Sequence, residues 1–220
     1  MDTRGYFFID GSHLFSRIAA IWRVRSNFKK KKLDIGVLTR VLISKWNFDA
    51  SPIVRATYYF KKGDKRIKEM LNIPKANKPG EKNRWQIDEC GEAVKSIPDS
   101  YLQRLPEKYR DQYRRSEKGL DIKLTCDTLN LVSNGKASNI VFMVNDSDYI
   151  PLFKAVQYLG ANVYLTGLDS SQKPQNNLAE LSDRYLTLDD ELESIFGITK
   201  QQVQQEVQQV IQPEQPPQNT

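Results

Sequence analysis

An apolar segment that ends abruptly in acids constrains the fold of this chain more than any other feature. Residues 140 to 144 (IVFMV) form a run rich in β-branched and aromatic side chains, which is typical of a strand buried on both faces of a parallel sheet. The run is followed directly by Asn145, Asp146, Ser147 and Asp148. Ligands of open α/β sheets bind outside the carboxyl ends of the strands. The segment therefore predicts a strand that delivers two carboxylates to a ligand-binding edge.

The N-terminus repeats this arrangement. Residues 6 to 9 (YFFI) lead straight into Asp10, and Ser12 then stands where a helix N-cap is expected. Carboxylates brought to one sheet edge repel each other unless a cation lies between them. The chain has a single histidine, His13, so multi-histidine zinc sites are excluded. Oxygen ligands favour Mg²⁺ or Mn²⁺.

A fourth acid, Asp121, lies at the start of a helix expected over residues 119 to 133. Asp127 follows six positions later, roughly 120° round the helix, and is therefore the weaker candidate. A divalent ion held by such acids lowers the pKa of bound water and stabilises charge on a phosphodiester. These acids can also have purely structural roles. Asp10 and Asp148 can each cap a helix, and an acid in a first helical turn, such as Asp121, interacts favourably with the helix dipole whatever its function.

The charge distribution indicates a polyanionic partner. The net charge is +6 and the pI is about 9.2, and basic residues cluster at four places between residues 29 and 118, against an acidic stretch over 183 to 193. Such an asymmetric field favours nucleic acid. No apolar run approaches the roughly 20 residues of a membrane span, and no signal peptide is recognised, so we expect a cytoplasmic protein whose cysteines, Cys90 and Cys126, are free thiols.

Alternating strand and helix patterns predict an α/β fold with a parallel sheet between helices. The weakly patterned residues 61 to 117 are expected to be a basic insertion, because a connection of that length is unusual in a compact domain. Beyond residue 197 the chain becomes rich in Gln and Pro, which predicts a largely disordered tail over 197 to 220. The strands are expected at 5–10, 53–60, 84–88, 139–145, 162–167 and 185–188, and the helices at 12–22, 33–46, 66–71, 107–115, 119–133, 149–159 and 176–181.

Three motifs in order resemble the NYN domains of the PIN-like nuclease superfamily, most closely the LabA/DUF88-like branch. They are FIDGSHLF at residues 8 to 15, KGLDI at 118 to 122 and VNDSDYIPL at 144 to 152. The resemblance covers roughly residues 5 to 190, and we expect an NYN domain over 1 to 196. It departs from the family at His13, where the family usually has Asn.

The resemblance implies a three-layer α/β/α sandwich and metal-dependent cleavage of RNA. Mg²⁺ or Mn²⁺ would be held by Asp10, Asp121, Asp146 and Asp148. His13, which departs from the family pattern, can contact a phosphate or water or act in proton transfer, and it can equally weaken the site or mark a changed preference. Ser12, Arg17 and Lys118 are the expected contacts to the RNA, which is single-stranded or structured.

Two other functions stay open. A catalytically weak RNA-binding or regulatory module would keep the same fold and basic surface. Separately, a homo-oligomer or a protein partner could bind through the C-terminal tail. An aspartyl-nucleophile phosphatase also begins with a strand ending in Asp, but it needs a second Asp two residues later, where this chain has Ser12.

Overall fold

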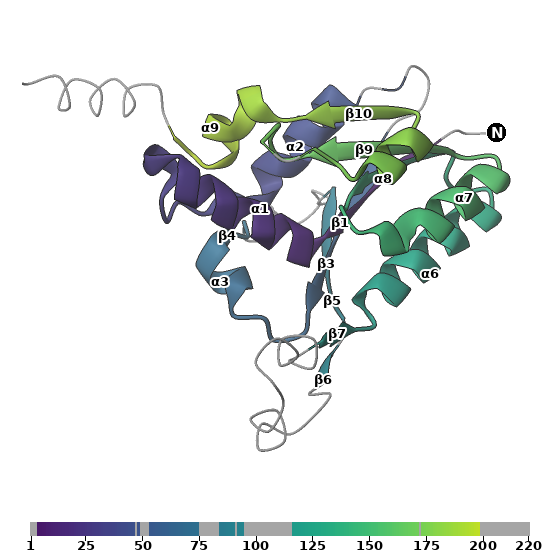
Figure 1. Cartoon of the computed structure of the whole chain (residues 1–220), viewed down its shortest axis with the longest axis horizontal. Helices are drawn as coiled ribbons and strands as arrows, with labels where there is room; N and C mark the ends of the chain where they lie inside the picture. The colour runs from purple at the N-terminus through teal and green to yellow at the C-terminus, as the bar shows by residue number, and fades with distance from the viewer. Residues whose placement is uncertain are drawn as a thin grey trace, which may run out of the picture.

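A six-stranded sheet forms the centre of the molecule (Figure 1). The computed structural model describes residues 4–46, 48, 53–74, 84–90, 92–94, 116–171 and 173–198. The strand order is β10-β9-β8-β1-β3-β5, and all neighbouring pairs are parallel. The carboxyl ends of these strands therefore lie at one edge, as the sequence predicts.

The sheet strands are β1 (Gly5–Asp10), β3 (Ile53–Lys61), β5 (Trp85–Cys90), β8 (Asn139–Met143), β9 (Asn162–Gly167) and β10 (Arg184–Thr187). Two smaller pairs join β2 (Leu33–Asp34) to β4 (Leu71–Asn72) and β6 (Glu92–Val94) to β7 (Ser116–Lys118). The longer helices are α1 (Gly11–Val24), α2 (Ile35–Lys45), α6 (Leu120–Ser133) and α7 (Ile150–Tyr158). The shorter ones are α3 (Arg66–Met70), α8 (Asn176–Leu181), α9 (Leu192–Ile195), η1 (Ser26–Phe28), η3 (Ser147–Tyr149) and η4 (Asp189–Glu191).

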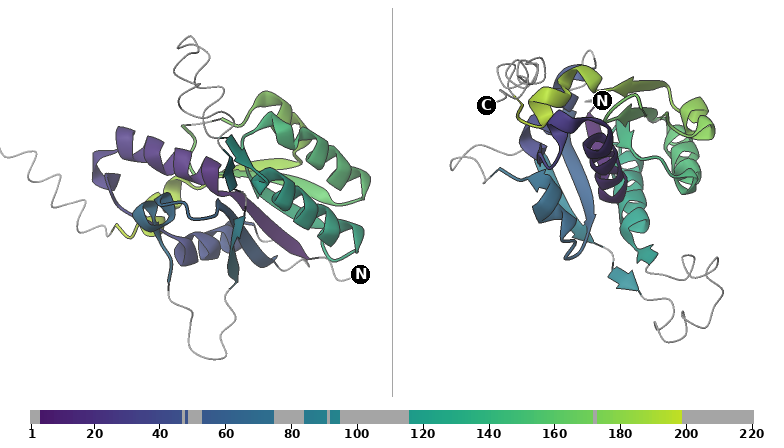
Figure 2. Two further views of the ribbon diagram at one scale, coloured as in Figure 1. Left: turned by 90° about the horizontal axis from the view of Figure 1, so that it is seen from below. Right: turned by 60° about the vertical axis from the view of Figure 1, so that its left-hand side comes forward.

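Helices cover both faces of the sheet, which confirms the three-layer α/β/α architecture (Figure 2). Helices α1, α2 and α9 pack on one face, where Phe7, Ile9 and Tyr58 are fully buried. Helices α6, α7 and α8 pack on the other, against Phe8 and Phe142. Because successive side chains of a strand point to opposite faces, a strand between two helical layers must be apolar throughout. Every residue of β8 is buried.

Several boundaries differ from the predictions. The expected helix over 33 to 46 begins with the short strand β2, because Leu33 and Asp34 pair with β4. The expected loop over 23 to 32 contains the end of α1 and the turn η1. Within the predicted insertion, β5 pairs with β3 and forms an edge of the central sheet, so this part of the segment belongs to the sheet. The expected helix over 107 to 115 and the tail after 198 lie outside the described residues.

Both cysteines are free thiols, as predicted. Among the described residues, no helix is long and apolar enough to cross a membrane.

Candidate metal and nucleic-acid site

Asp10 lies where β1 ends and α1 begins, and it caps the helix. Its Oδ1 accepts hydrogen bonds from the backbone N–H groups of Ser12 (2.8 Å) and His13 (3.1 Å). The prediction that Ser12 is the N-cap was therefore wrong. The chain turns into the helix directly after the strand, so the residue with extended backbone and a free side-chain acceptor is Asp10 itself.

Tyr149 joins two of the predicted acids. Its hydroxyl lies 3.1 Å from Asp10 Oδ2 and 2.8 Å from Asp121 Oδ1. The tyrosine is 1% exposed, and it ends η3, the turn that follows β8. Tyr149 is not among the predicted site residues, although it directly follows Asp148 in the acidic motif. A single phenol between two carboxylates holds them at a defined separation.

The pair is electrostatically unfavourable without a counter-charge. Asp10 is only 7% exposed, and burial raises its pKa to about 6. This value already includes the negative charge of Asp121, which also raises the pKa, and the hydrogen bonds from His13, Tyr149 and Ser12, which lower it. A cation at the pair would relieve both the desolvation and the repulsion.

Asp146 and Asp148 precede Tyr149, the residue that contacts this pair, by three positions and one, and both are exposed. Asp146 Oδ1 accepts a hydrogen bond from the backbone N–H of Asp148 at 3.0 Å and caps η3. The alternative of Asp148 as the cap is therefore wrong, because the turn begins two residues earlier than the expected helix. Among the described residues, no three Asp, Glu, His or Cys side chains are grouped closely enough to hold a metal ion.

The residues that do converge fit a hard divalent ion. Mg²⁺ is usually held by one or two carboxylates and keeps several waters, so Asp10 and Asp121 supply a sufficient protein contribution. All the donor atoms of this pair are carboxylate oxygens, which bind hard cations better than soft metals.

His13 and Arg17 line a small cavity of about 10 Å³ together with Asn145 and Asp169. Arg17 is 7% exposed and bonds to Asp169 and, at 2.7 Å, to Ser171 Oγ. Burial, with the positive charge of Arg17, lowers the pKa of His13 to about 4. His13 is therefore a neutral imidazole at physiological pH. The Arg17 guanidinium is turned to Asp169, and its contact with RNA stays a prediction.

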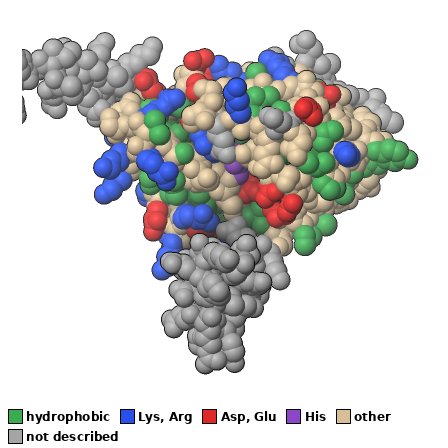
Figure 3. All heavy atoms as spheres, in the orientation of Figure 1, with side chains coloured by type: hydrophobic (Ala, Val, Ile, Leu, Met, Phe, Trp, Pro, Cys, Tyr) green, Lys and Arg blue, Asp and Glu red, His purple; other side chains and the backbone are tan. Residues whose placement is uncertain are grey.

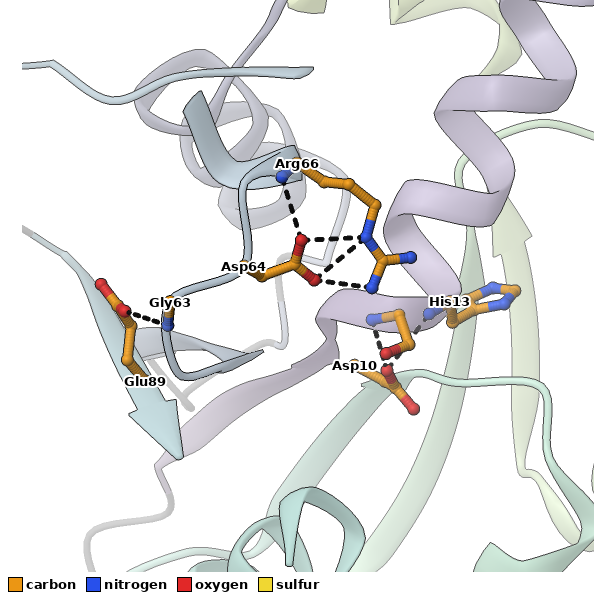
Figure 4. A network of polar contacts seen from close by, with 7 residues as sticks. Asp10, His13, Gly63, Asp64, Arg66 and Glu89 are labelled. Carbon is orange, nitrogen blue, oxygen red and sulfur yellow. Dashed lines mark hydrogen bonds and ion pairs between the residues drawn. The ribbon is translucent and has the colours of Figure 1, made fainter. Parts of the chain in front are cut away.

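Arg66 is another basic residue near Asp10, and unlike Arg17 it was not among the predicted site residues (Figure 4). Its guanidinium contacts both carboxylate oxygens of Asp64, with Nη2 2.6 Å from Oδ2 and Nε 3.0 Å from the same atom. Arg66 also lies over the ring of Phe15, 4.8 Å from its centroid. Figure 4 shows the guanidinium between Asp64 and the first turn of α1, where Asp10 and His13 lie. Only the fold reveals this placement, because Arg66 is 56 positions from Asp10.

The two remaining candidates are Asp127 and Lys118. Asp127, the weaker candidate, accepts from the Tyr59 hydroxyl at 3.0 Å and pairs with Lys123 at 2.7 Å, so its charge is neutralised locally. Lys118 ends β7, opposite Glu92, but its side chain lies outside the described residues.

The surface around the site combines both signs of charge. Figure 3 shows the histidine next to a patch of acidic side chains, with lysines and arginines gathered over α1 and α3 on one side of that patch. An acidic centre beside a basic surface suits a substrate whose backbone is an anion.

The comparisons with known proteins agree with this arrangement. The family model of the NYN domain matches residues 6–189, a span that includes all four predicted acids. No curated protein matches the chain. The match covers more than half of the 220 residues, and the fold and the acidic sheet edge fit it, so the chain belongs to the NYN domain family of the PIN-like nuclease superfamily.

Proposed function

We propose that this protein is a metal-dependent endoribonuclease. The observation that supports the proposal best is the pair of carboxylates from Asp10 and Asp121, joined by the Tyr149 hydroxyl at the carboxyl edge of the sheet. The repulsion between the two carboxylates and the burial of Asp10 create a place where a hard cation is stabilising. The NYN family and the basic surroundings favour RNA as the substrate.

Asp10 and Asp121 would hold Mg²⁺ or Mn²⁺, and Asp146 and Asp148, which come just before Tyr149 in the chain, would contribute through water. When bound, the metal supplies an activated water and charge stabilisation on the phosphodiester. The Tyr149 hydroxyl lies within hydrogen-bond distance of both carboxylates and keeps them in position by donating its one proton to either of them. His13, neutral near pH 7, can donate or accept one hydrogen bond at a phosphate or a water. Arg66 offers a planar guanidinium suited to phosphate oxygens.

The test is cleavage of end-labelled RNA by the full chain in Mn²⁺, in Mg²⁺ and in EDTA. Asp10→Asn and Asp121→Asn each remove one charge of the pair while keeping the side-chain size, so we expect each to lose about 100-fold or more of the cleavage rate. Lys136→Ala, at an exposed position after α6, is the matched control and should cleave normally. Metal-independent cleavage, or full activity in both Asn variants, would contradict the proposal.

A catalytically weak RNA-binding module is the second candidate. One observation favours it: among the residues that the structure describes, the acids form a pair and not a group of three. This function predicts RNA binding that is unchanged by Asp10→Asn and no cleavage of any RNA in either metal.

The finer assignments remain predictions. These are the LabA/DUF88-like branch, the cytoplasmic location, the domain limits at 1 and 196, and a homo-oligomer or partner bound through the tail. The family match does not distinguish between the branches.

A further inference from the structure

Two basic segments that are distant in sequence form one continuous surface. Residues 23 to 32 and 61 to 69 together carry eleven Lys or Arg residues and two acids, Asp64 and Glu69. The fold brings them side by side, because β2 pairs with β4 and the Lys32 Nζ donates to the backbone carbonyl of Lys68 at 2.7 Å. We call one part of this surface the lysine track. It consists of Lys65, Arg66 and Lys68 and of the turn formed by Lys29, Lys30, Lys31 and Lys32.

The track begins beside the acid pair. Arg66 is its nearest member, and the Asp64 carboxylate and the Phe15 ring hold its guanidinium against the first half of α1. Asp64 is itself largely buried by this contact, with 9% of its side chain exposed. Because two groups fix the guanidinium, little conformational entropy is lost when it binds a phosphate.

The track ends about one helix length from the acid pair. Helix α1 has 14 residues and so spans about 21 Å, with Asp10 before its first residue and the lysine turn after its last. A stacked strand rises about 3.4 Å per nucleotide, so roughly six nucleotides separate a phosphate at the acid pair from one at the turn. Lys29, Lys30, Lys31 and Lys32 are all exposed.

We infer that the lysine track binds the single-stranded RNA that flanks the cleavage site on one side. This deepens the proposed function and rests on it, since it names the path of the same substrate. Cations that run from α3 to the turn after η1, beside α1, match one phosphate backbone, and the exposed lysines of the turn act as point charges without base recognition. The affinity for RNA should therefore depend on the length of the RNA and on the salt concentration, and not on the RNA sequence.

The experiment measures the affinity of the full chain for single-stranded RNA of about four and about twelve nucleotides, in EDTA so that metal-dependent cleavage does not occur. The variant Lys29→Ala/Lys31→Ala should weaken binding of the long RNA about tenfold at 0.1 M salt and reduce the slope of log affinity against log salt by about 1.4. The short RNA does not reach the turn, so its affinity should stay the same. Arg66→Gln should weaken binding of both lengths.

The matched control is Lys136→Ala/Lys154→Ala, which removes two exposed lysines from the helix layer of α6 and α7. Its effect should be less than twofold for both RNAs. An equal loss in the control and in the lysine-turn variant, or an equal loss for both RNA lengths, overturns the lysine track. Failure of the nuclease proposal is distinguishable, because it would appear as length-dependent binding with no cleavage in Mg²⁺ or Mn²⁺.

Discussion

At the scale of single residues, Asp10 carries conflicting demands. It caps α1 through Oδ1 and shares Tyr149 with Asp121 through Oδ2, yet it is buried and its pKa is raised to about 6. A group whose native pKa lies above the unfolded value loses native stability as pH rises between the two values. Asp10 therefore lowers the stability of the metal-free protein at neutral pH, which is expected where function and stability compete.

The first prediction follows from this sign. Asp10→Asn keeps a good N-cap residue and removes the carboxylate, so in EDTA the variant should be more stable than the wild type above about pH 6, by about 2–3 kcal/mol at most. The advantage should shrink as pH falls toward 4, because the native wild-type carboxyl is then protonated and no longer carries a buried charge. Urea unfolding at a series of pH values measures this difference.

His13 contributes equally to the pH dependence of the unfolding free energy in the wild type and in Asp10→Asn. Its native pKa is lowered to about 4, so the unfolded chain binds more protons between pH 4 and 6.5 and stability rises with pH there. The difference between Asp10→Asn and wild type cancels this contribution. A stability difference that does not vary between pH 4 and 7 would contradict the raised pKa of Asp10.

At the scale of elements, the junction of β1 and α1 depends on one glycine. A Cβ at Gly11 would lie 2.4 Å from the backbone carbonyl oxygen of Tyr59 and 2.2 Å from Phe60 Cδ1. Strand β3 thus passes so close to the start of α1 that no side chain fits. This close approach lets the helix begin directly after Asp10 and fixes the carboxylate at the sheet edge.

Gly11→Ala tests this junction. Alanine favours a helix by about 1 kcal/mol over glycine, but the backbone clash should outweigh this gain and destabilise the protein by about 2–4 kcal/mol. Thermal and urea unfolding measure the change. Ser16→Ala, at an exposed position of the same helix, should stay within about 0.5 kcal/mol of wild type; comparable stability for both variants would show that β3 can move aside.

At the scale of the whole molecule, a buried ion pair ties the two halves of the chain together. Arg17 on α1 bonds to Asp169, which follows β9 and is 3% exposed, across 152 positions of sequence. A buried pair adds little net stability relative to apolar residues, but breaking it leaves an uncompensated charge. The tie also closes one wall of the cavity that His13 lines.

Arg17→Met should therefore destabilise the protein by about 3–5 kcal/mol. The double variant Arg17→Met/Asp169→Asn removes the stranded charge as well, so it should be more stable than Arg17→Met alone. A double-mutant cycle in urea measures the coupling. If the two single losses simply add, the pair does not link the two halves energetically.

The sequence by itself determined the layered architecture and most of its elements, because the signals are local. The fully apolar run before Asp146 indicates a strand buried on both faces, and the structure confirms it in β8. The helical spacing after Gly119 likewise gives α6. The N-cap of α1 was assigned to Ser12 and is Asp10, because the identity of the cap depends on where the strand stops, and periodicity cannot resolve that position.

Only the tertiary structure decided which charges meet. Asp10 and Asp121 are brought together by Tyr149, Arg66 reaches the same edge through Asp64, and the lysine turn joins α3 through Lys32. No local pattern encodes these contacts, since each one joins segments that are distant in sequence and is set by the order of strands in the sheet. The sequence thus determined that acids stand at the strand ends, and the packing of the sheet determined which of them form a pair and which basic side chains surround it.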